Sequence, residues 1–213
     1  MNLPNKLTIF RIILSIIIII LLLFPFHTIG FEFPRYIVSS IYVDSRYIIS
    51  GVLFIIASLT DFLDGYIARK YNLITDFGKM MDSIADKILV NSVLIILSSA
   101  GFINPIITVI IIVRDSITNA IKMVAGNKGQ VVAAIGTGKI KAACLMIGIV
   151  LTLFYNLPFE IYNLNVAEFW LIFATVLYII SLMQYYQMNK KDIFEQKQKL
   201  KILTLWEIFL LFR

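Results

Sequence analysis

The chain has 213 residues, of which 60% are hydrophobic and only 15% charged, and its mean hydropathy is +0.89. Soluble globular domains usually carry about 25% charged residues, so this composition excludes an ordinary soluble domain and indicates an integral membrane protein. Basic residues that face an anionic membrane surface would explain the net charge of +6. A nucleic-acid partner is therefore not needed to explain this charge. The single cysteine, Cys144, excludes an intrachain disulfide.

Six apolar stretches follow one another along the chain, and each is close to the length of about 20 residues that crosses a bilayer as a helix. They run from Ile9 to Thr28, Tyr47 to Arg69, Lys79 to Phe102, Pro105 to Ala125, Ile135 to Tyr155 and Val166 to Met188. The sequence therefore predicts an all-α integral membrane protein with six transmembrane helices and both termini on one side. The first stretch lacks a small-residue cleavage site, so we expect it to be retained rather than removed as a signal peptide.

Lysine and arginine gather in the loops on one side of this predicted bundle. That side holds Lys6, Arg11, Arg69, Lys70, Lys79, Lys122, Lys128, Lys139, Lys141 and the basic residues after Lys190, whereas the other side has only Arg35 and Arg46. Loops rich in basic residues stay in the cytoplasm, so we expect both termini there, in segments that lie at the membrane interface.

The last part of the chain differs from the rest. We expect residues 1–189 to form the membrane domain and residues 190–213 to form a basic and apolar tail. The apolar stretch from Ile202 to Phe212 is too short to cross the bilayer, which favours a position in the interface.

Four aspartates lie inside or beside apolar stretches, where each charge costs about 2.5 to 3.5 kcal/mol. Asp61 and Asp64 share one helix face, as do Asp82 and Asp86, because side chains three or four residues apart are neighbours on a helix. A short connector, Lys70 to Phe77, joins the two helices, so the pairs can converge. The cluster then needs protons or a divalent cation, and oxygen ligands suit Mg²⁺ or Mn²⁺.

Small and basic residues accompany the aspartates. Gly65, Ala68 and Gly78 leave room for a ligand beside the carboxylates, and Arg69 and Lys87 supply cations, which together fit a phosphate substrate. Close helix packing is the alternative interpretation of the small residues.

The signature as a whole resembles that of the CDP-alcohol phosphatidyltransferases. It consists of Asp61, Asp64, Gly65, Ala68, Arg69, Gly78, Asp82 and Asp86, all at the spacing of that family. The resemblance implies that all four aspartates hold divalent metal, two ions of Mg²⁺ or Mn²⁺, and that Asp86 acts as the general base. It also implies a site for CDP bordered by Asp64, Gly65, Ala68, Arg69 and Gly78.

A closer resemblance covers most of the chain. The opening from Asn2 to Arg11, the pair Arg114 and Asp115, and the segment from Gly138 to Lys141 resemble the bacterial branch that joins CDP-diacylglycerol to sn-glycerol 3-phosphate. This implies a homodimer in the bacterial cell membrane whose active site faces the cytoplasm. The chain departs from that branch in having Ser83 for proline, Asp115 for glutamate and Lys122 for arginine.

Glycerol 3-phosphate brings a second anion, for which the chain offers four cations at predicted cytoplasmic helix ends: Arg11, Arg114, Lys139 and Lys141. Arginine binds phosphate in a bidentate manner and lysine as a mobile point charge. Arg114 is the strongest candidate because it lies deep in a span, although a structural pair with Asp115 or with the aspartate cluster is the alternative. For the two lysines the alternative is membrane topology alone.

Other functions remain compatible with these residues. The same reaction could use inositol phosphate, serine or phosphatidylglycerol as acceptor. A cation or proton transporter would also place carboxylates in the membrane, but at successive depths, whereas these four gather near one face. A purely structural cluster is the third alternative.

Overall fold

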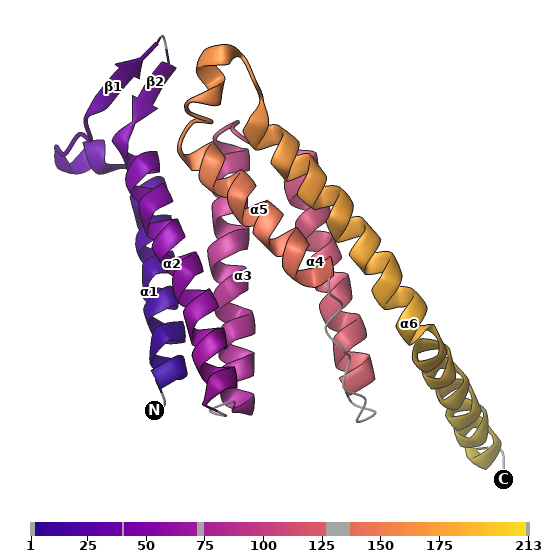
Figure 1. Cartoon of the computed structure of the whole chain (residues 1–213). Helices are drawn as coiled ribbons and strands as arrows, with labels where there is room; N and C mark the ends of the chain where they lie inside the picture. Colours follow the sequence, from indigo (N-terminus) through magenta and orange to yellow (C-terminus); the bar gives the residue numbers. More distant parts are fainter. Residues whose placement is uncertain (1–2, 40, 72–74, 127–136, 212–213) are drawn as a thin grey trace.

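The computed structural model describes residues 3–39, 41–71, 75–126 and 137–211, which form a bundle of helices that run up and down (Figure 1). The helices are α1 (Leu3–Leu23), α2 (Ser45–Lys70), α3 (Asp76–Ser99), α4 (Pro105–Gly126), α5 (Thr137–Leu153) and α6 (Val166–Leu211). α1 packs on α2 and α3, while α6 packs on α4 and α5. Each helix overlaps most of one predicted apolar stretch, so the mostly helical fold is confirmed.

Three of these helices are long and apolar enough to cross a membrane, within the part of the chain that the structure describes. The candidate spans are Pro4–Leu23, Ser45–Ala68 and Val166–Met188, and Ile140–Leu153 forms a shorter apolar helix. Large apolar side chains also cover the outside of the bundle, including Ile13, Ile106 and Phe169, which are 50%, 65% and 64% exposed. An apolar outer surface of this extent is what lipid contact requires.

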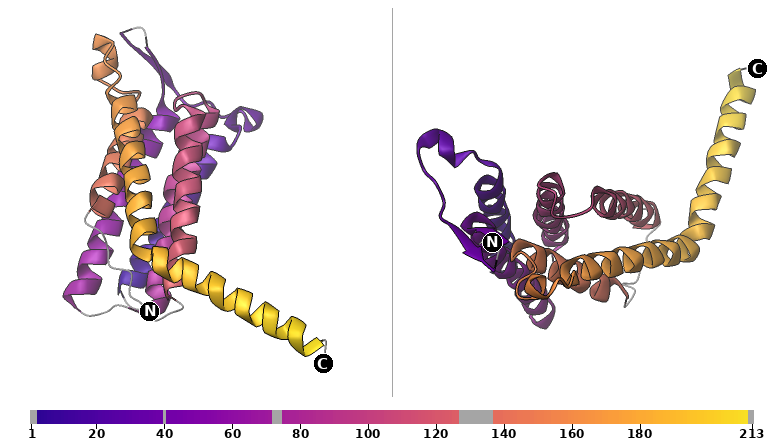
Figure 2. Two further views of the ribbon diagram at one scale, coloured as in Figure 1. Left: turned by 90° about the vertical axis from the view of Figure 1, so that its right-hand side faces the viewer. Right: turned by 90° about the horizontal axis from the view of Figure 1, so that it is seen from above.

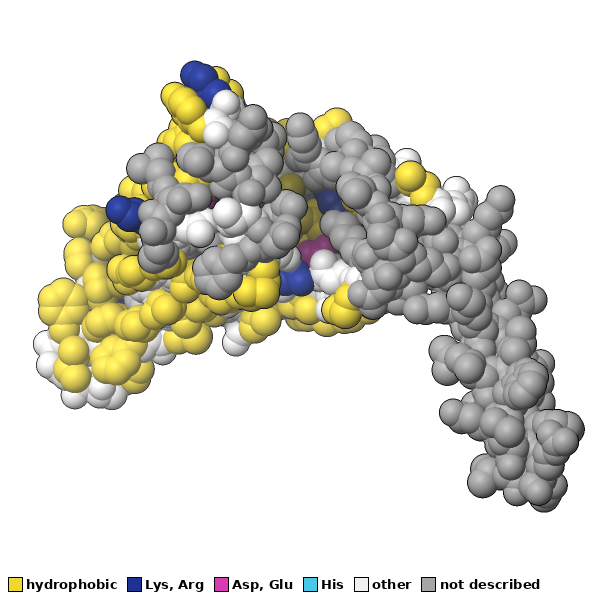
Figure 3. Space-filling model, turned by 90° about the horizontal axis from the view of Figure 1, so that it is seen from below, with side chains coloured by type: hydrophobic (Ala, Val, Ile, Leu, Met, Phe, Trp, Pro, Cys, Tyr) yellow, Lys and Arg dark blue, Asp and Glu magenta, His cyan; other side chains and the backbone are white. Residues whose placement is uncertain are grey.

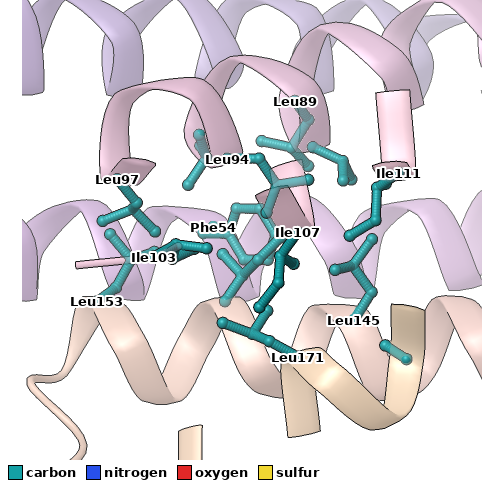
Figure 4. Close-up of a cluster of buried hydrophobic side chains, with 14 of the residues drawn as sticks. Phe54, Leu89, Leu94, Leu97, Ile103, Ile107, Ile111, Leu145, Leu153 and Leu171 are labelled. Carbon is teal, nitrogen blue, oxygen red and sulfur yellow. The ribbon is translucent and has the colours of Figure 1, made fainter. Parts of the chain in front are cut away.

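The interior is a continuous cluster of mostly aliphatic side chains from α1, α2, α3, α4, α5 and α6, with Phe54 at its middle (Figure 4). Leu94, Leu97, Ile111, Leu145, Leu153 and Leu171 are among its members and are 2% exposed or less. This cluster holds the helices that carry the polar side chains described below.

The chain between α1 and α2 forms structure that the apolar pattern did not predict. α1 ends at Leu23, before Pro25, because the residue that precedes a proline is driven out of the helical region. A short 3₁₀ helix, η1 (Phe26–Ile29), and an antiparallel hairpin, β1 (Arg35–Val38) with β2 (Ile41–Asp44), follow. The predicted first span, which extended to Thr28, was therefore too long at this end.

Asp44 fixes the start of α2. Its carboxylate accepts hydrogen bonds from the Arg46 backbone N–H at 2.9 Å and from Arg46 Nη2 at 2.7 Å. Burial alone would raise the pKa of Asp44, but the bonds from Arg46 outweigh it and hold this pKa below its usual range. The Asp44 backbone N–H donates to the Tyr155 hydroxyl at 3.0 Å, which ties the hairpin to the end of α5.

A buried amide organises the connection from α5 to α6, which includes the 3₁₀ helix η2 (Phe159–Tyr162). Asn156 donates from Nδ2 to the Leu164 carbonyl at 2.7 Å, and its Oδ1 accepts from the Ala167 N–H at 3.0 Å. One side chain therefore closes the loop and satisfies a free N–H at the start of α6.

α6 continues well beyond the predicted span Val166–Met188 and reaches Leu211 without a break. The sequence contains no glycine or proline over this range, so no residue there interrupts the helix. Its last part, drawn in yellow, projects away from the bundle (Figure 2). The side chains of the predicted tail, residues 190–213, lie outside the described residues.

Close approach of α5 and α6 depends on Gly148, which is buried. A Cβ at this position would lie 2.8 Å from Leu171 Cδ2 and 3.3 Å from the Leu171 backbone nitrogen. We expect Gly148→Ala to lower the free energy of unfolding by about 1–3 kcal/mol, because overpacking of a rigid contact forces the helices apart. Unfolding in detergent checks this, with Ala143→Ser, on an exposed position of the same helix, as the control. Equal stability of the two variants would contradict it.

Candidate active site

Three of the four signature aspartates meet around one arginine. Arg11 of α1 forms ion pairs with Asp61 and Asp64 of α2, and its Nη2 lies 3.6 Å from Oδ1 of Asp82 of α3. The Arg11 and Asp64 side chains are 0% and 3% exposed, whereas Asp61 and Asp82 are 38% and 43% exposed. The prediction that the two aspartate-bearing helices converge is therefore confirmed for these three residues.

The first turns of α1 supply more of this centre than the sequence indicated. The Thr8 hydroxyl, buried one turn before Arg11, donates to Asp82 Oδ1 at 2.5 Å. Asn5 lies against Gly78, where a Cβ would come within 2.9 Å of Asn5 Oδ1. Asn5, Thr8 and Arg11 follow one another at intervals of three residues, and this spacing was the signal that they share one face of α1.

These carboxylates fit a divalent cation by charge and by donor type. Within the described residues no three metal-binding side chains lie close enough together to hold an ion as they stand, because the Arg11 guanidinium lies between Asp61 and Asp64. Three carboxylates against one guanidinium leave an excess of two negative charges. All the donors are oxygens, which hard ions such as Mg²⁺ prefer. Arg11 Nε is also buried without a hydrogen-bond partner.

Asp86, the fourth aspartate, faces a different space. It is exposed and also lines a small cavity of about 20 Å³ at the junction of α3, α4, α5 and α6. Lys87, Asn91, Asp115 and Tyr178 line the same cavity. Asp86 lies within electrostatic range of Asp61 as well as of Asp115. It therefore stands between the aspartate cluster and a second polar centre.

That second centre contains two of the predicted acceptor cations. Arg114, which is 4% exposed, donates from Nε to the Tyr178 carbonyl at 2.9 Å, from Nη2 to Ser181 Oγ at 2.9 Å and from Nη1 to Asp115 Oδ1 at 2.7 Å. Lys141 Nζ lies 4.5 Å from the centroid of the Tyr178 ring. The expected alternative partner of Arg114, Asp115, is indeed bonded to it. Sequence reasoning missed Tyr178 and Ser181, which stand three apart in an apolar span.

The structure describes the surroundings of some of the remaining predicted residues but not of others. Gly65 and Ala68 lie on α2, half-buried, and Gly78 is buried near the start of α3. The side chains of Arg69, Lys122 and Lys139 lie outside the described residues. Seen from the end of the bundle that holds the N-terminus, acidic and basic side chains lie together in a hollow (Figure 3).

Comparison with known proteins identifies the family. Residues 1–183 match the family model described as CDP-alcohol phosphatidyltransferase. A protein of Bacillus subtilis named CDP-diacylglycerol–glycerol-3-phosphate 3-phosphatidyltransferase is 38% identical over 188 residues, which cover 88% of this chain and 95% of the relative. Proteins with the same name from Haemophilus influenzae, at 34% identity (92% and 98% covered), and Mycoplasma pneumoniae, at 36% (72% and 68%), are also similar. The match over residues 1–183 includes the whole signature, and the chain belongs to the CDP-alcohol phosphatidyltransferase family.

Proposed function

We propose that this protein transfers the phosphatidyl group of CDP-diacylglycerol to sn-glycerol 3-phosphate, giving phosphatidylglycerol phosphate and CMP. It is thus a phosphatidylglycerophosphate synthase, an enzyme of phospholipid biosynthesis. The observation that carries the proposal is the aspartate signature, of which three carboxylates meet around Arg11 and the fourth lines a cavity. Relatives whose names state this reaction match most of the chain.

Asp61, Asp64, Asp82 and Asp86 are the residues that would hold two divalent ions, Mg²⁺ or Mn²⁺. Such ions, when bound, neutralise the charge that develops on phosphoryl oxygens and on a departing phosphate. The excess of negative charge around Arg11 supports this assignment.

The chemistry of the chain itself rests on Asp86 as general base. Asp86 takes the proton of the acceptor hydroxyl, whose oxygen forms a bond to the phosphorus that carries diacylglycerol. The bond from that phosphorus to the oxygen of CMP breaks, and CMP leaves with the electron pair. Asp86 is exposed, which supports this role, because the acceptor must reach the carboxylate.

The two substrates occupy different parts of the site. Asp64, Gly65, Ala68, Arg69 and Gly78 border the CDP moiety of the donor. Arg114, Lys139 and Lys141 bind the phosphate of the acceptor, and Arg11 adds a cation on the side of the aspartates. The contacts of Arg114 and Lys141 with one tyrosine, near the cavity that Asp86 lines, support this division.

In the membrane, we propose six transmembrane helices with both termini in the cytoplasm, so that the active site faces the cytoplasm of a bacterial cell. The end of α2 and the start of α3, which carry the signature aspartates, lie at the end of the bundle that holds the N-terminus (Figure 1), which supports this orientation. Residues 1–189 form the catalytic domain, residues 190–213 an interfacial tail, and the enzyme is a homodimer.

The test measures CMP release by the purified protein in proteoliposomes that contain CDP-diacylglycerol. Glycerol 3-phosphate, inositol phosphate, serine and phosphatidylglycerol are offered in separate reactions, each with Mg²⁺ and with EDTA. We expect release only with glycerol 3-phosphate and only with Mg²⁺. Release with another acceptor would overturn the substrate, and no release in any reaction would favour cation or proton transport.

A further inference from the structure

The ring of Tyr178 contacts both Arg114 and Lys141. The Arg114 guanidinium carbon lies 4.9 Å from the ring centroid, and Lys141 Nζ lies 4.5 Å from it. The three residues come from α4, α5 and α6, so the ring joins cations from two helices to a third. Tyr178 and Arg114 are only 6% and 4% exposed, so the contact between these two side chains is shielded from water.

The ring has a physical reason to hold these two charges. The face of an aromatic ring is negative, so it attracts both cations, whereas the cations repel each other. Arg114 is in addition fixed by hydrogen bonds to the Tyr178 carbonyl and to Ser181. Lysine is a point charge on a flexible stem, so contact with the ring restricts the positions that the Lys141 ammonium can take.

Tyr178 also faces the site of the proposed chemistry. It lines the cavity that contains Asp86, Asn91 and Asp115. An acceptor that carries both a hydroxyl and a phosphate must place its hydroxyl at the base and its phosphate at the cations. The distance between the base and the cations must therefore match the distance between the two groups of the acceptor. Tyr178 contacts both cations and lines the same small cavity as Asp86. Its ring can therefore set the distance between the cations and the base.

From these contacts we infer that Tyr178 is a positioning residue for the acceptor phosphate: its ring aligns Arg114 and Lys141 beside the cavity that Asp86 lines. The inference rests on the proposed function. It adds Tyr178, which acts on the acceptor through Arg114 and Lys141. It predicts an effect on the acceptor alone, because no described contact joins Tyr178 to the aspartates around Arg11.

The experiment compares Tyr178→Leu with Tyr178→Phe in reconstituted, Mg²⁺-loaded enzyme. Loss of the ring should raise the KM for glycerol 3-phosphate about tenfold. The KM for CDP-diacylglycerol and kcat should change little. Phenylalanine keeps the ring, so Tyr178→Phe should retain the wild-type KM for the acceptor. Should the leucine variant unfold in detergent, Tyr178→Met, which keeps the length without the ring face, takes its place.

A double-mutant cycle with Lys141→Met tests whether the tyrosine acts through the lysine. We expect Tyr178→Leu to raise the acceptor KM much less in the Lys141→Met background than in the wild type, because contacting residues are not additive. Additive effects of the two substitutions on the acceptor KM would overturn the inference, as would an unchanged acceptor KM in a folded Tyr178→Leu variant. In either case, transfer to glycerol 3-phosphate by the wild-type enzyme would leave the proposed function intact. Wild-type enzyme that fails to use glycerol 3-phosphate would overturn the proposed function itself.

Discussion

Asp86→Asn should lower the rate of CMP release by about 10²- to 10⁴-fold, the usual contribution of a positioned general base. The amide is nearly the same size as the carboxylate but cannot accept the proton of the acceptor hydroxyl. Steady-state assays with glycerol 3-phosphate and CDP-diacylglycerol measure the effect. Asp44→Asn, in the hairpin at the opposite end of the bundle, is the matched control and should keep wild-type activity (Figure 1).

The same variant separates the two roles proposed for Asp86. If Asp86 acts chiefly as base, stabilisation of the protein by Mg²⁺ against thermal unfolding should be close to that of the wild type. If it is mainly a metal ligand, that stabilisation should fall together with activity. An Asp86→Asn variant that retains more than about a tenth of wild-type activity would remove the residue from the base role.

Arg11→Met should lower the stability of the metal-free protein by about 3 kcal/mol, since breaking a buried ion pair costs roughly 3–5 kcal/mol. The lower end applies because Asp61 and Asp82 are 38% and 43% exposed, and solvent screens part of their repulsion. The variant leaves three carboxylates without their guanidinium. Mg²⁺ supplies positive charge to the same carboxylates, so the loss should be smaller in excess Mg²⁺ than in EDTA.

Unfolding in detergent under the two conditions measures this difference. Arg46→Met removes the partner of Asp44 at the other end of the bundle, so its effect on stability should be the same with Mg²⁺ and with EDTA. An Arg11→Met variant that loses equal stability in both conditions would show that metal ions do not bind at the carboxylates around Arg11.

Local features of the sequence determined the helices and one part of the site. Apolar stretches of about 20 residues predicted all six helices, because the length of an apolar stretch is a local property of the sequence. Helix periodicity placed Asp61 with Asp64, and the short connector to Asp82 brought the next helix beside them. The ends of two helices differ from the predicted ones. Pro25 ends α1 before Thr28, and α6 continues beyond Met188 because no glycine or proline interrupts it.

Only the tertiary structure decided which side chains from distant segments meet. Arg11 was expected with the acceptor cations, yet it contacts aspartates 50 and more residues later in the chain. Nothing local in the sequence marked Tyr178, whose ring contacts Arg114 and Lys141 because α4 and α5 pack against α6. Periodicity fixes the face of a helix on which a residue lies. The partner of that face is set by how the helices pack around the core, and no local pattern records it.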